Sequence, residues 1–315
     1  MEKETIERNG KCIYDMFKAN FKRDNFPIVD IFSQDLSCDV TMIIPTYGDN
    51  RHYMYQVYHY YKHLKCKIII CDQSPTRQNY ISEFDTSDHF HYINVNKKFA
   101  DAVSEALNLV TTPFVCFWTQ DDFLYYEALS DGVAFLKTNS EYGSYIGRMR
   151  QYIYEEDRFI DYSEKIFEKR ELKSTPKKAI KDFFLNPYVC CWGIYRTDLL
   201  KKVFQLISKI EKFENQFFYE YMFNTIILSS SGVHIDAKKW FAIKELTQGE
   251  CWRNQSPHPW SVKNSQAIKS DIANIKVIVD QEFGQGITDC MVKYYFYNMT
   301  LKGKIVRRIK KLFKI

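Results

Sequence analysis

Apolar runs and helical spacing alternate along the chain between residues 40 and 120. Continuous apolar runs predict buried strands, and apolar residues at helical spacing predict amphipathic helices between them. The strands are expected at residues 40–44, 66–71, 90–95 and 113–118, and the helices at residues 51–64 and 98–110. This alternation is typical of an α/β fold with a mixed, mainly parallel sheet flanked by helices.

The pattern is less regular in the second half of the chain. A strand is predicted at residues 187–195, followed by a helix at 197–211 that Thr197 caps and a helix at 214–230. Between residues 155 and 182, sixteen of 28 residues are charged. This segment is therefore expected to be a mobile, solvated excursion from the domain.

The pattern also divides the chain into three parts. Residues 1–38 are expected to form a helical segment and a connector, because their apolar spacing ends at Pro27. Residues 39–250 form the expected main domain, with halves at 39–122 and 123–250. Residues 251–315 are expected to be a helical region that ends in a basic tail.

Composition and charge exclude several classes of protein. Hydrophobic residues make up 45% of the chain and charged residues 26%, which excludes disordered, collagen-like and coiled-coil proteins. The net charge of +5 comes from the last fifteen residues, which hold seven Lys or Arg and no acid, so a nucleic-acid partner is not expected. No signal peptide or membrane-spanning run is visible, and nine scattered cysteines indicate reduced thiols in a cytoplasm.

Acidic side chains follow two of the predicted strands. Asp72 comes after strand 66–71, and Asp121 and Asp122 follow strand 113–118. Ligands of parallel sheets bind beyond the carboxyl ends of the strands, so these acids are expected at one edge. Together they fit a nucleotide site, in which Asp72 accepts a base N–H and Asp122 holds a divalent cation on the diphosphate. Taken singly, a helix N-cap or a solvated turn explains each acid as well.

Five segments, in this order, resemble the family 2 glycosyltransferases of the GT-A fold. The resemblance is strongest to a bacterial subgroup in which a TTPFV-type strand leads into a DDF acidic motif. The segments are TMIIPTYGDNR, IIICDQS, FADAVSEALNLVTTPFVCFWTQDDF, YGSYIGRMRQY and CCWGIYRTDLL. The resemblance covers about residues 40–245, and it implies a GT-A (Rossmann-like) fold and a nucleotide-sugar donor.

The resemblance also implies roles for individual residues. Asp122 matches the ligand of a divalent cation, Mn²⁺ or Mg²⁺, and Glu220, in FFYEYMF, matches the catalytic base. Trp192 and Gly193 match the segment that forms the acceptor side. The positions that match the nucleotide-binding residues are Pro45, Thr46, Tyr47, Asp72, Ser74 and Asp121.

Two positions depart from the family pattern. The first acidic position of the metal motif is Gln120 here, which bears on metal affinity, although one Asp ligand can suffice in the family. The base is followed by Tyr221 where the family usually has a second acid. Glu214, one and a half turns earlier, is a rival for the role of Glu220.

These residue types are consistent with inverting transfer, and the inversion itself is implied by the family resemblance alone. One carboxylate deprotonates the acceptor hydroxyl as it attacks the anomeric carbon, and a cation stabilises the departing nucleoside diphosphate. With the resemblance, they predict a metal-dependent inverting, hexosyltransferase-like enzyme. Its donor is expected to be UDP-linked, and its acceptor a glycan, lipid-linked, in bacterial surface polysaccharide or glycolipid synthesis. A catalytically inactive glycan- or membrane-binding relative is the alternative that Gln120 suggests.

Two segments near the end of the chain carry further candidates. In residues 248–260, Arg253 and His258 could close over the diphosphate, although the segment alone favours a plain surface loop. Residues 301–315 combine an apolar helical face with a basic one, which is typical of a helix on an anionic membrane. A helix docked on the protein body is the other interpretation. The membrane interpretation predicts a cytoplasmic protein, peripheral at the inner face of the cell membrane.

Overall fold

The computed structural model describes most of the chain from residue 35 to residue 299. The described residues are 35–48, 54, 57–58, 60–62, 64–78, 89–153, 158–161, 170–172, 174–185, 191–215, 217–245 and 265–299. The helix predicted within residues 1–38, the loop 248–260 and the tail 301–315 therefore lie outside the described residues, apart from positions 35–38.

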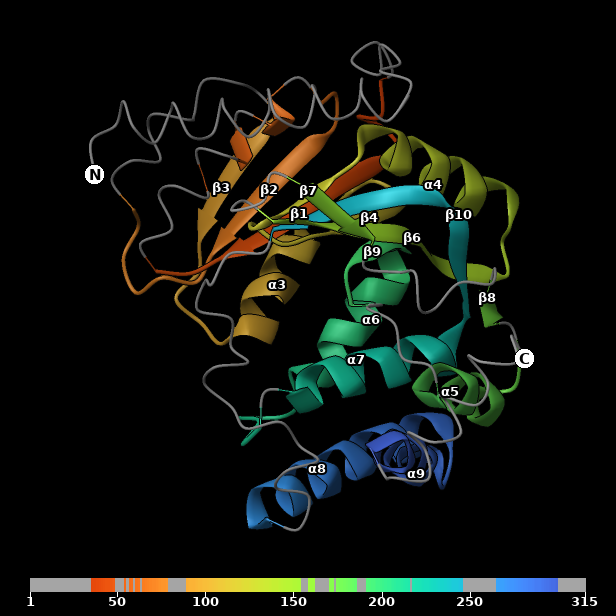
Figure 1. Ribbon diagram of the computed structural model, residues 1–315. Helices are drawn as coiled ribbons and strands as arrows, with labels where there is room; N and C mark the ends of the chain where they lie inside the picture. The colour runs from red at the N-terminus through yellow and green to blue at the C-terminus, as the bar shows by residue number, and fades with distance from the viewer. Residues whose placement is uncertain are drawn as a thin grey trace.

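A single mixed sheet forms the centre of the described structure (Figure 1). Its strand order is β3-β2-β1-β4-β9-β6-β10-β5, with β7 paired to β6 and β8 to β10. The strands are β1 Val40–Thr46, β2 Lys67–Asp72, β3 Phe90–Asn94, β4 Phe114–Phe117, β5 Asp122–Leu124, β6 Tyr142–Ile153, β7 Arg158–Asp161, β8 Arg170–Leu172, β9 Gly193–Arg196 and β10 Gly232–Glu245. The longest pairings, β1 with β2 and β6 with β10, are parallel. The predicted mixed, mainly parallel sheet of the GT-A type is confirmed.

Helices cover both faces of the sheet. Figure 1 shows α4 on one face and α3, α6 and α7 on the other, while α8 and α9 lie against α7 on the side away from the sheet. The helices are α3 Phe99–Asn108, α4 Tyr126–Thr138, α5 Pro176–Leu185, α6 Thr197–Ile207, α7 Phe217–Ser230, α8 Gln266–Phe283 and α9 Ile287–Met299. In the helix predicted at 51–64, the described residues Met54, Val57, Tyr60 and Tyr61 are helical and buried. Their spacing is that of one helical face turned to the core.

Strand β1 runs two residues further than its sequence predicts. All seven of its residues are buried, as expected for a central strand with helices on both faces. Proline cannot donate a ladder hydrogen bond and was expected to end the strand at Ile44. The ladder with β4 ends at Ile43, so Pro45 pairs only with β2, through Cys71, and a missing N–H is tolerated there.

Three other predictions for the second half of the chain need correction. The charged segment 155–182 is not a solvated excursion throughout, because it contributes β7 and β8 to the sheet and the start of α5. Thr197 does not cap α6: it is the first helical residue, Arg196 is the cap, and the Thr197 hydroxyl donates to the Thr112 carbonyl at 2.7 Å. In the strand predicted at 187–195, the described residues Cys191 and Trp192 precede β9, which begins at Gly193, and residues 187–190 lie outside the described residues.

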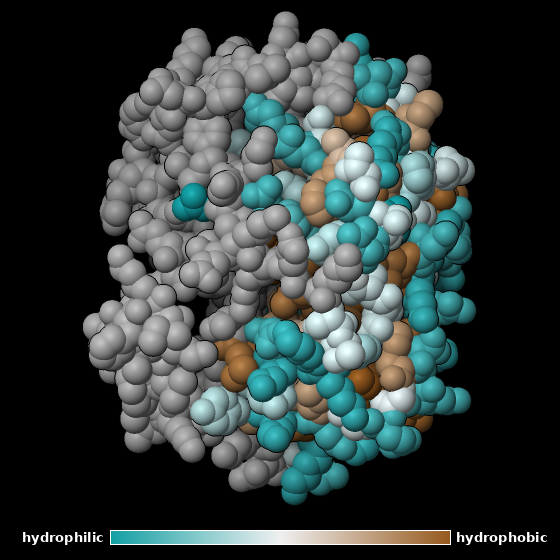
Figure 2. Space-filling view, turned by 90° about the vertical axis from the view of Figure 1, so that its right-hand side faces the viewer, coloured by the Kyte–Doolittle hydropathy of each residue, from teal (hydrophilic) through white to brown (hydrophobic). Residues whose placement is uncertain are grey.

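The described surface is mainly hydrophilic. Figure 2 views the molecule from the right-hand side of Figure 1, and hydrophobic side chains are scattered over this face instead of forming one large patch. The large hydrophobic side chains described as exposed are Tyr47, Leu109 and Val277. In the described part of the chain, every helix is too short or too polar to cross a bilayer.

Candidate active site

A hydrogen-bonded cluster joins the carboxyl ends of β1 and β2. Asp72, the last residue of β2, is fully buried, and its Oδ1 accepts from the backbone N and the hydroxyl of Ser74 at 2.8 and 2.5 Å. The Ser74 hydroxyl in turn accepts from the backbone N of Gly48 at 2.9 Å. Gly48 has a φ of 73°, a conformation that glycine adopts without a Cβ clash, and it lets the chain turn at the end of β1. Tyr47, next to it, is 63% exposed at this edge.

Strand β3 contributes two residues that the sequence analysis did not single out. The Tyr92 hydroxyl donates to Oδ2 of Asp72, and the Asn94 side-chain amide donates to the Ser74 carbonyl at 2.9 Å. The Arg77 guanidinium lies 5.1 Å from the centre of the Tyr92 ring. The sequence did contain a signal, because Tyr92 and Asn94 are two residues apart and so share one face at the end of a strand.

The end of β1 is also connected to the acidic turn after β4. The Thr46 hydroxyl donates to the side-chain oxygen of Gln120 at 2.5 Å across 74 residues of sequence. Within the turn, the Thr119 hydroxyl donates to the Asp121 carboxylate and accepts from the Asp121 backbone N. Gln120, which replaces an acid of the family motif, therefore acts as a link between two strand ends.

Asp122 begins strand β5 and is 6% exposed. The Trp118 indole N–H donates to the Asp122 carbonyl at 2.8 Å. Two residues further along β5, the backbone N of Leu124 donates to the Tyr61 hydroxyl at 2.9 Å. Burial, with smaller contributions from Tyr60 and Asp122, raises the pKa of Tyr61, so this phenol stays neutral beside the acid. Both bonds hold the backbone of the acidic turn in place.

The residues of the turn fit a cation that is shared with a substrate. Among the described residues there is no group of three or more His, Cys, Asp or Glu side chains that could enclose a metal ion. Mg²⁺ in nucleotide sites is typically held by one or two carboxylates together with substrate phosphates, and it keeps several waters. A single carboxylate such as that of Asp122 meets this requirement. A site made of protein ligands alone would need more side chains than the described residues bring together.

The two predicted acceptor-side residues lie at the end of β4. Trp192 stacks on Phe117, with ring centres 4.8 Å apart, and Gly193 pairs with Phe117 in the β4–β9 ladder. A Cβ on Gly193 would lie 3.1 Å from the carbonyl oxygen of Tyr145, so this close approach of β9 to β6 favours glycine. The Phe223 ring of α7 is also stacked with that of Phe117, with ring centres 6.4 Å apart.

Glu220 reaches the same region through α7. It lies in the first turn of the helix, one turn before Phe223 and therefore on the same helical face. Its side chain is half-buried, and its charge contributes to the raised pKa of the buried Tyr219 phenol, after burial and Cys191. Glu214 differs: it is exposed in the loop before α7 and forms an ion pair with Lys212 at 3.6 Å. This arrangement favours Glu220 over Glu214, because Glu220 is the half-buried acid and lies on the helix that packs against Phe117.

Two of the remaining candidates, Arg253 and His258, lie outside the described residues. His234 of β10 is buried and stacks on Phe135 and Tyr145, with ring centres 4.0 and 5.5 Å away.

Comparison with known proteins identifies the family. Residues 41–204, more than half of the chain, match the family described as glycosyl transferase family 2. The chain belongs to glycosyl transferase family 2. Its members are transferases of glycosyl groups, so the predicted family and enzyme class are confirmed. Among curated proteins, none matches the sequence significantly.

Solved structures of similar fold come from a glycosyltransferase of S. aureus. TarS residues 1–349 in complex with UDP-GlcNAc match with a TM-score of 0.57 and 14% identity, over 84% of this chain and 76% of that chain. Another structure of TarS residues 1–349 matches with a TM-score of 0.54 and 14% identity, over 82% of this chain and 72% of that chain. At this identity the likeness shows a shared fold.

Proposed function

We propose that this family 2 member transfers a sugar from a UDP-linked donor to a glycan acceptor hydroxyl with inversion at the anomeric carbon. The acceptor we propose is lipid-linked, in bacterial surface polysaccharide or glycolipid synthesis, and the chain belongs to the subgroup with a DDF acidic motif. The observation that carries this proposal is the convergence of the ends of β1, β2 and β4. Thr46 with Gln120, and Gly48 with Ser74 and Asp72, bring the three strand ends into one hydrogen-bonded edge.

The proposed donor site uses polar groups of this edge. Pro45 and Thr46, the last residues of β1, and Tyr47 directly after them lie along the nucleoside in this proposal, and the exposed ring of Tyr47 offers a stacking surface. Asp72 has both carboxylate oxygens engaged, with Ser74 and with Tyr92. Its part in base recognition therefore includes holding Ser74 and the chain around it. Asp121 lies beside the diphosphate in this proposal.

The proposed transfer divides its work between two acids. Glu220 takes the proton of the acceptor hydroxyl as that oxygen attacks the anomeric carbon. Glu220 lies in the first turn of α7 and is half-buried. Asp122 would hold Mn²⁺ or Mg²⁺, which supplies Lewis-acid stabilisation of the departing diphosphate. Trp192 and Gly193 border the acceptor.

The proposed reaction is tested with purified protein and a panel of nucleotide sugars, with Mn²⁺ and with a chelator. We expect release of UDP from one donor, lost on chelation and reduced about 100-fold or more in Asp122→Ala and Glu220→Gln. Asp198→Asn, an exposed acid of α6, is the matched control and should keep wild-type turnover. If both site variants turn over like the control, these two assignments are wrong.

The same assay separates an enzyme from an inactive relative. An inactive glycan- or membrane-binding protein would release no UDP from any donor, with or without metal, while calorimetry still detected glycan or vesicle binding. UDP binding that depends on Mn²⁺ and on Asp122, together with turnover, contradicts that alternative.

We also propose that residues 301–315 attach the enzyme peripherally to the inner face of the cell membrane. Each basic residue near an anionic surface contributes about 1 kcal/mol, so a segment with several of them binds without a spanning helix. Deleting residues 301–315 should abolish sedimentation with anionic vesicles, and unchanged sedimentation would refute the attachment.

A further inference from the structure

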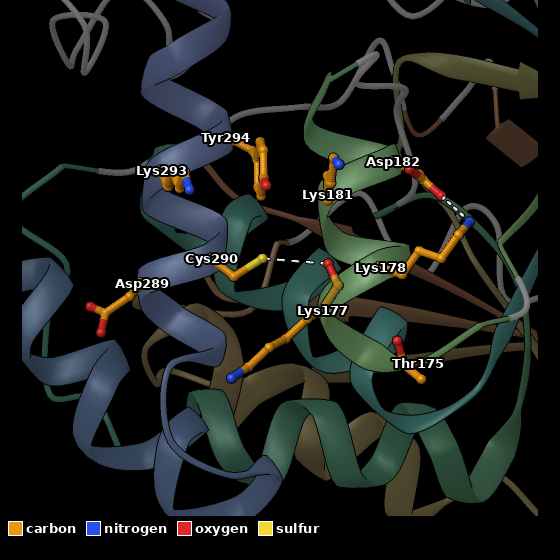
Figure 3. Close-up of a pocket in the computed structure, with 9 residues that line it drawn as sticks. All are labelled: Thr175, Lys177, Lys178, Lys181, Asp182, Asp289, Cys290, Lys293 and Tyr294. Atoms are coloured by element: carbon orange, nitrogen blue, oxygen red, sulfur yellow. Dashed lines mark hydrogen bonds and ion pairs between the residues drawn. The ribbon is translucent and has the colours of Figure 1, made fainter.

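A groove with a volume of about 580 Å³ lies between α5 and α9, apart from the residues of the candidate active site (Figure 3). Four of its nine lining residues are lysines and two are aspartates, and most of the lining area is apolar, because it comes from side-chain carbons. The two helices are held together beneath the groove, where Phe184 of α5 packs edge-on against Tyr295 of α9.

The two acids of the groove are neutralised by neighbouring lysines. Asp182 pairs with Lys178 at 2.8 Å, and Asp289 pairs with Lys276 of α8 at 2.7 Å. In Figure 3 the Lys178–Asp182 pair lies on the side of α5 away from α9, and Asp289 points away from α5. Neither carboxylate therefore offsets positive charge between the two helices.

Three exposed ammonium groups remain at the groove, on Lys177 and Lys181 of α5 and Lys293 of α9. Within the described part of the chain, no carboxylate forms an ion pair with any of the three. All three charges act on Cys290 of α9. The Cys290 thiol donates to the Lys177 carbonyl at 3.4 Å across the groove. Burial raises the pKa of Cys290, and all three ammonium groups act in the opposite direction.

An aromatic ring lies between two of these charges. The Tyr294 ring centre is 5.7 Å from the Lys181 ammonium and 5.5 Å from that of Lys293. Tyrosine between lysines combines an apolar body with a polar rim, the arrangement that suits a boundary between water and lipid. The amino end of α5, where Thr175 accepts from the backbone N of Ala179 at 3.0 Å, adds positive partial charge.

We propose that this groove binds the phosphate of an anionic lipid headgroup and holds the folded body against a membrane. The three ammonium groups, which have no carboxylate partner among the described residues, surround a small concavity and could together neutralise the charge of one phosphate. Lysine binds phosphate as a point charge. A nucleic acid would need a longer basic track. The position in the chain favours lipid: α9 ends at Met299, directly before residues 301–315 with their seven Lys or Arg. The groove is thus a second membrane contact, formed by folded helices and separate from the transfer reaction.

The first test compares two variants of the full-length protein that remove equal charge. One replaces the groove lysines Lys177, Lys181 and Lys293 with Gln, and the control replaces Lys65, Lys209 and Lys269, which are equally exposed on other elements. Both are sedimented with vesicles of phosphatidylglycerol and phosphatidylcholine, without any sugar donor. At about 1 kcal/mol per lysine, the groove variant should lose about 100-fold in partition coefficient, and the control should lose far less. Equal losses in the two variants would overturn the proposal.

The second test locates the contact by lysine acetylation and mass spectrometry. Anionic vesicles should protect Lys177, Lys181 and Lys293 from acetylation and leave Lys65, Lys209 and Lys269 unchanged. Protection by inorganic phosphate alone at equal phosphate concentration would assign the groove to a free anion, and protection by a DNA oligonucleotide but not by vesicles would assign it to nucleic acid. Either result overturns the lipid assignment. Because no donor is present, failure here leaves the proposed transfer reaction unaffected.

Discussion

At the scale of single residues, hydrogen bonds between neighbouring side chains set the geometry of the candidate site. Asp72 is fully buried and takes hydrogen bonds from Ser74 and Tyr92, so its charge is satisfied inside the protein before any ligand binds. Hydrogen bonds to a charged group are stronger than those between neutral groups. The geometry of the base-recognition region is therefore set in part by Tyr92, a residue with no proposed ligand contact.

Replacing Tyr92 with Phe should destabilise the protein, because one oxygen of the buried Asp72 carboxylate loses its donor. We expect a loss of about 1–3 kcal/mol in the free energy of unfolding, measured by urea denaturation. Tyr47→Phe removes the same hydroxyl from an exposed ring and should be close to neutral. If the two variants are equally stable, the Tyr92–Asp72 bond contributes nothing measurable.

The choice of catalytic base gives a second prediction at this scale. Glu220 is half-buried in α7, whereas Glu214 is exposed and paired with Lys212. We expect Glu220→Gln to reduce kcat by about 100-fold or more, with little change in the KM for the donor, because only the proton acceptor is lost. Glu214→Gln should remain within about twofold of wild type in the same assay. The reverse order would assign the base to Glu214.

The sequence allowed the position of these residues to be predicted, but not their partners. Asp72, Asp121 and Asp122 were expected at the ends of strands, and they are found there or at the start of the next strand. The bond from Thr46 to Gln120 joins residues 74 positions apart, and local spacing contains no information about such a contact. The spacing of Tyr92 and Asn94 places both on one face at a strand end, but it does not identify Asp72 as the partner of Tyr92.

At the scale of elements, helix α8 determines how the chain enters α7. The carboxylate of Asp271, on α8, accepts from the backbone N of Glu214 at 2.9 Å and of Asn215 at 2.8 Å. Burial is the largest cause of the raised pKa of Asp271, and these two bonds oppose it. Because α7 begins two residues after Asn215, this carboxylate fixes the start of the helix that bears Glu220.

Asp271→Ala should therefore affect both stability and turnover. Two buried or half-buried N–H groups lose their acceptor, and we expect a loss of about 1–3 kcal/mol in the free energy of unfolding. We also expect a lower kcat with an unchanged affinity for UDP, because α7 shifts and the β1–β2 edge does not. Lys269→Ala, at an exposed position on the same helix, is the control. A variant with normal kcat would show that the α7 start does not depend on Asp271.

Helix α5 shows why one element was missed in the sequence. Its lysines and aspartate add to the charge of residues 155–182, and this composition suggested a solvated segment. The apolar residues Ala179, Ile180, Phe183 and Phe184 nevertheless recur at helical spacing, and all four are buried. Charge summed over a window hides a narrow apolar face, whereas the periodicity of that face predicts the helix.

At the scale of the whole molecule, the core includes thiols that water does not reach. Burial raises the pKa of Cys66 and of Cys71 to about 12, from an ordinary value near 9.0. The folded protein therefore retains these protons at a pH where the unfolded chain has lost them. The resulting contribution to stability is complete below pH 9 and is lost progressively as the pH rises towards 12.

The free energy of unfolding should thus fall as the pH is raised above 9, by up to about 1.4 kcal/mol per pH unit for each such thiol. Urea denaturation at pH 8 and pH 10 measures the slope, and Cys66→Ala should reduce it. At pH 8 a thiol reagent should label the exposed Cys38 in the native protein and leave Cys66 and Cys71 unmodified until unfolding. Labelling of all three in the native state would contradict their burial.

The overall architecture was only partly predictable. The sequence indicated the parallel pairs of β1, β2, β3 and β4, because strand and helix alternate there at regular spacing. The order in the second half, where β9 lies between β4 and β6 and β10 lies beside β6, depends on pairings between distant segments. Local periodicity does not determine such pairings, and the layer of α8 and α9 against α7 follows from packing alone.

The bond between Trp118 and the acidic turn gives the protein an optical reporter. Trp118 is fully buried, and its indole N–H donates to the backbone carbonyl of Asp122 at 2.8 Å. Indole emission is sensitive to the polarity and hydrogen bonding of its surroundings. With the other four tryptophans replaced by Phe, ligand-induced movement of the turn would change the emission maximum and lifetime of a single fluorophore. Metal and nucleotide titrations could then be followed in real time without any added label.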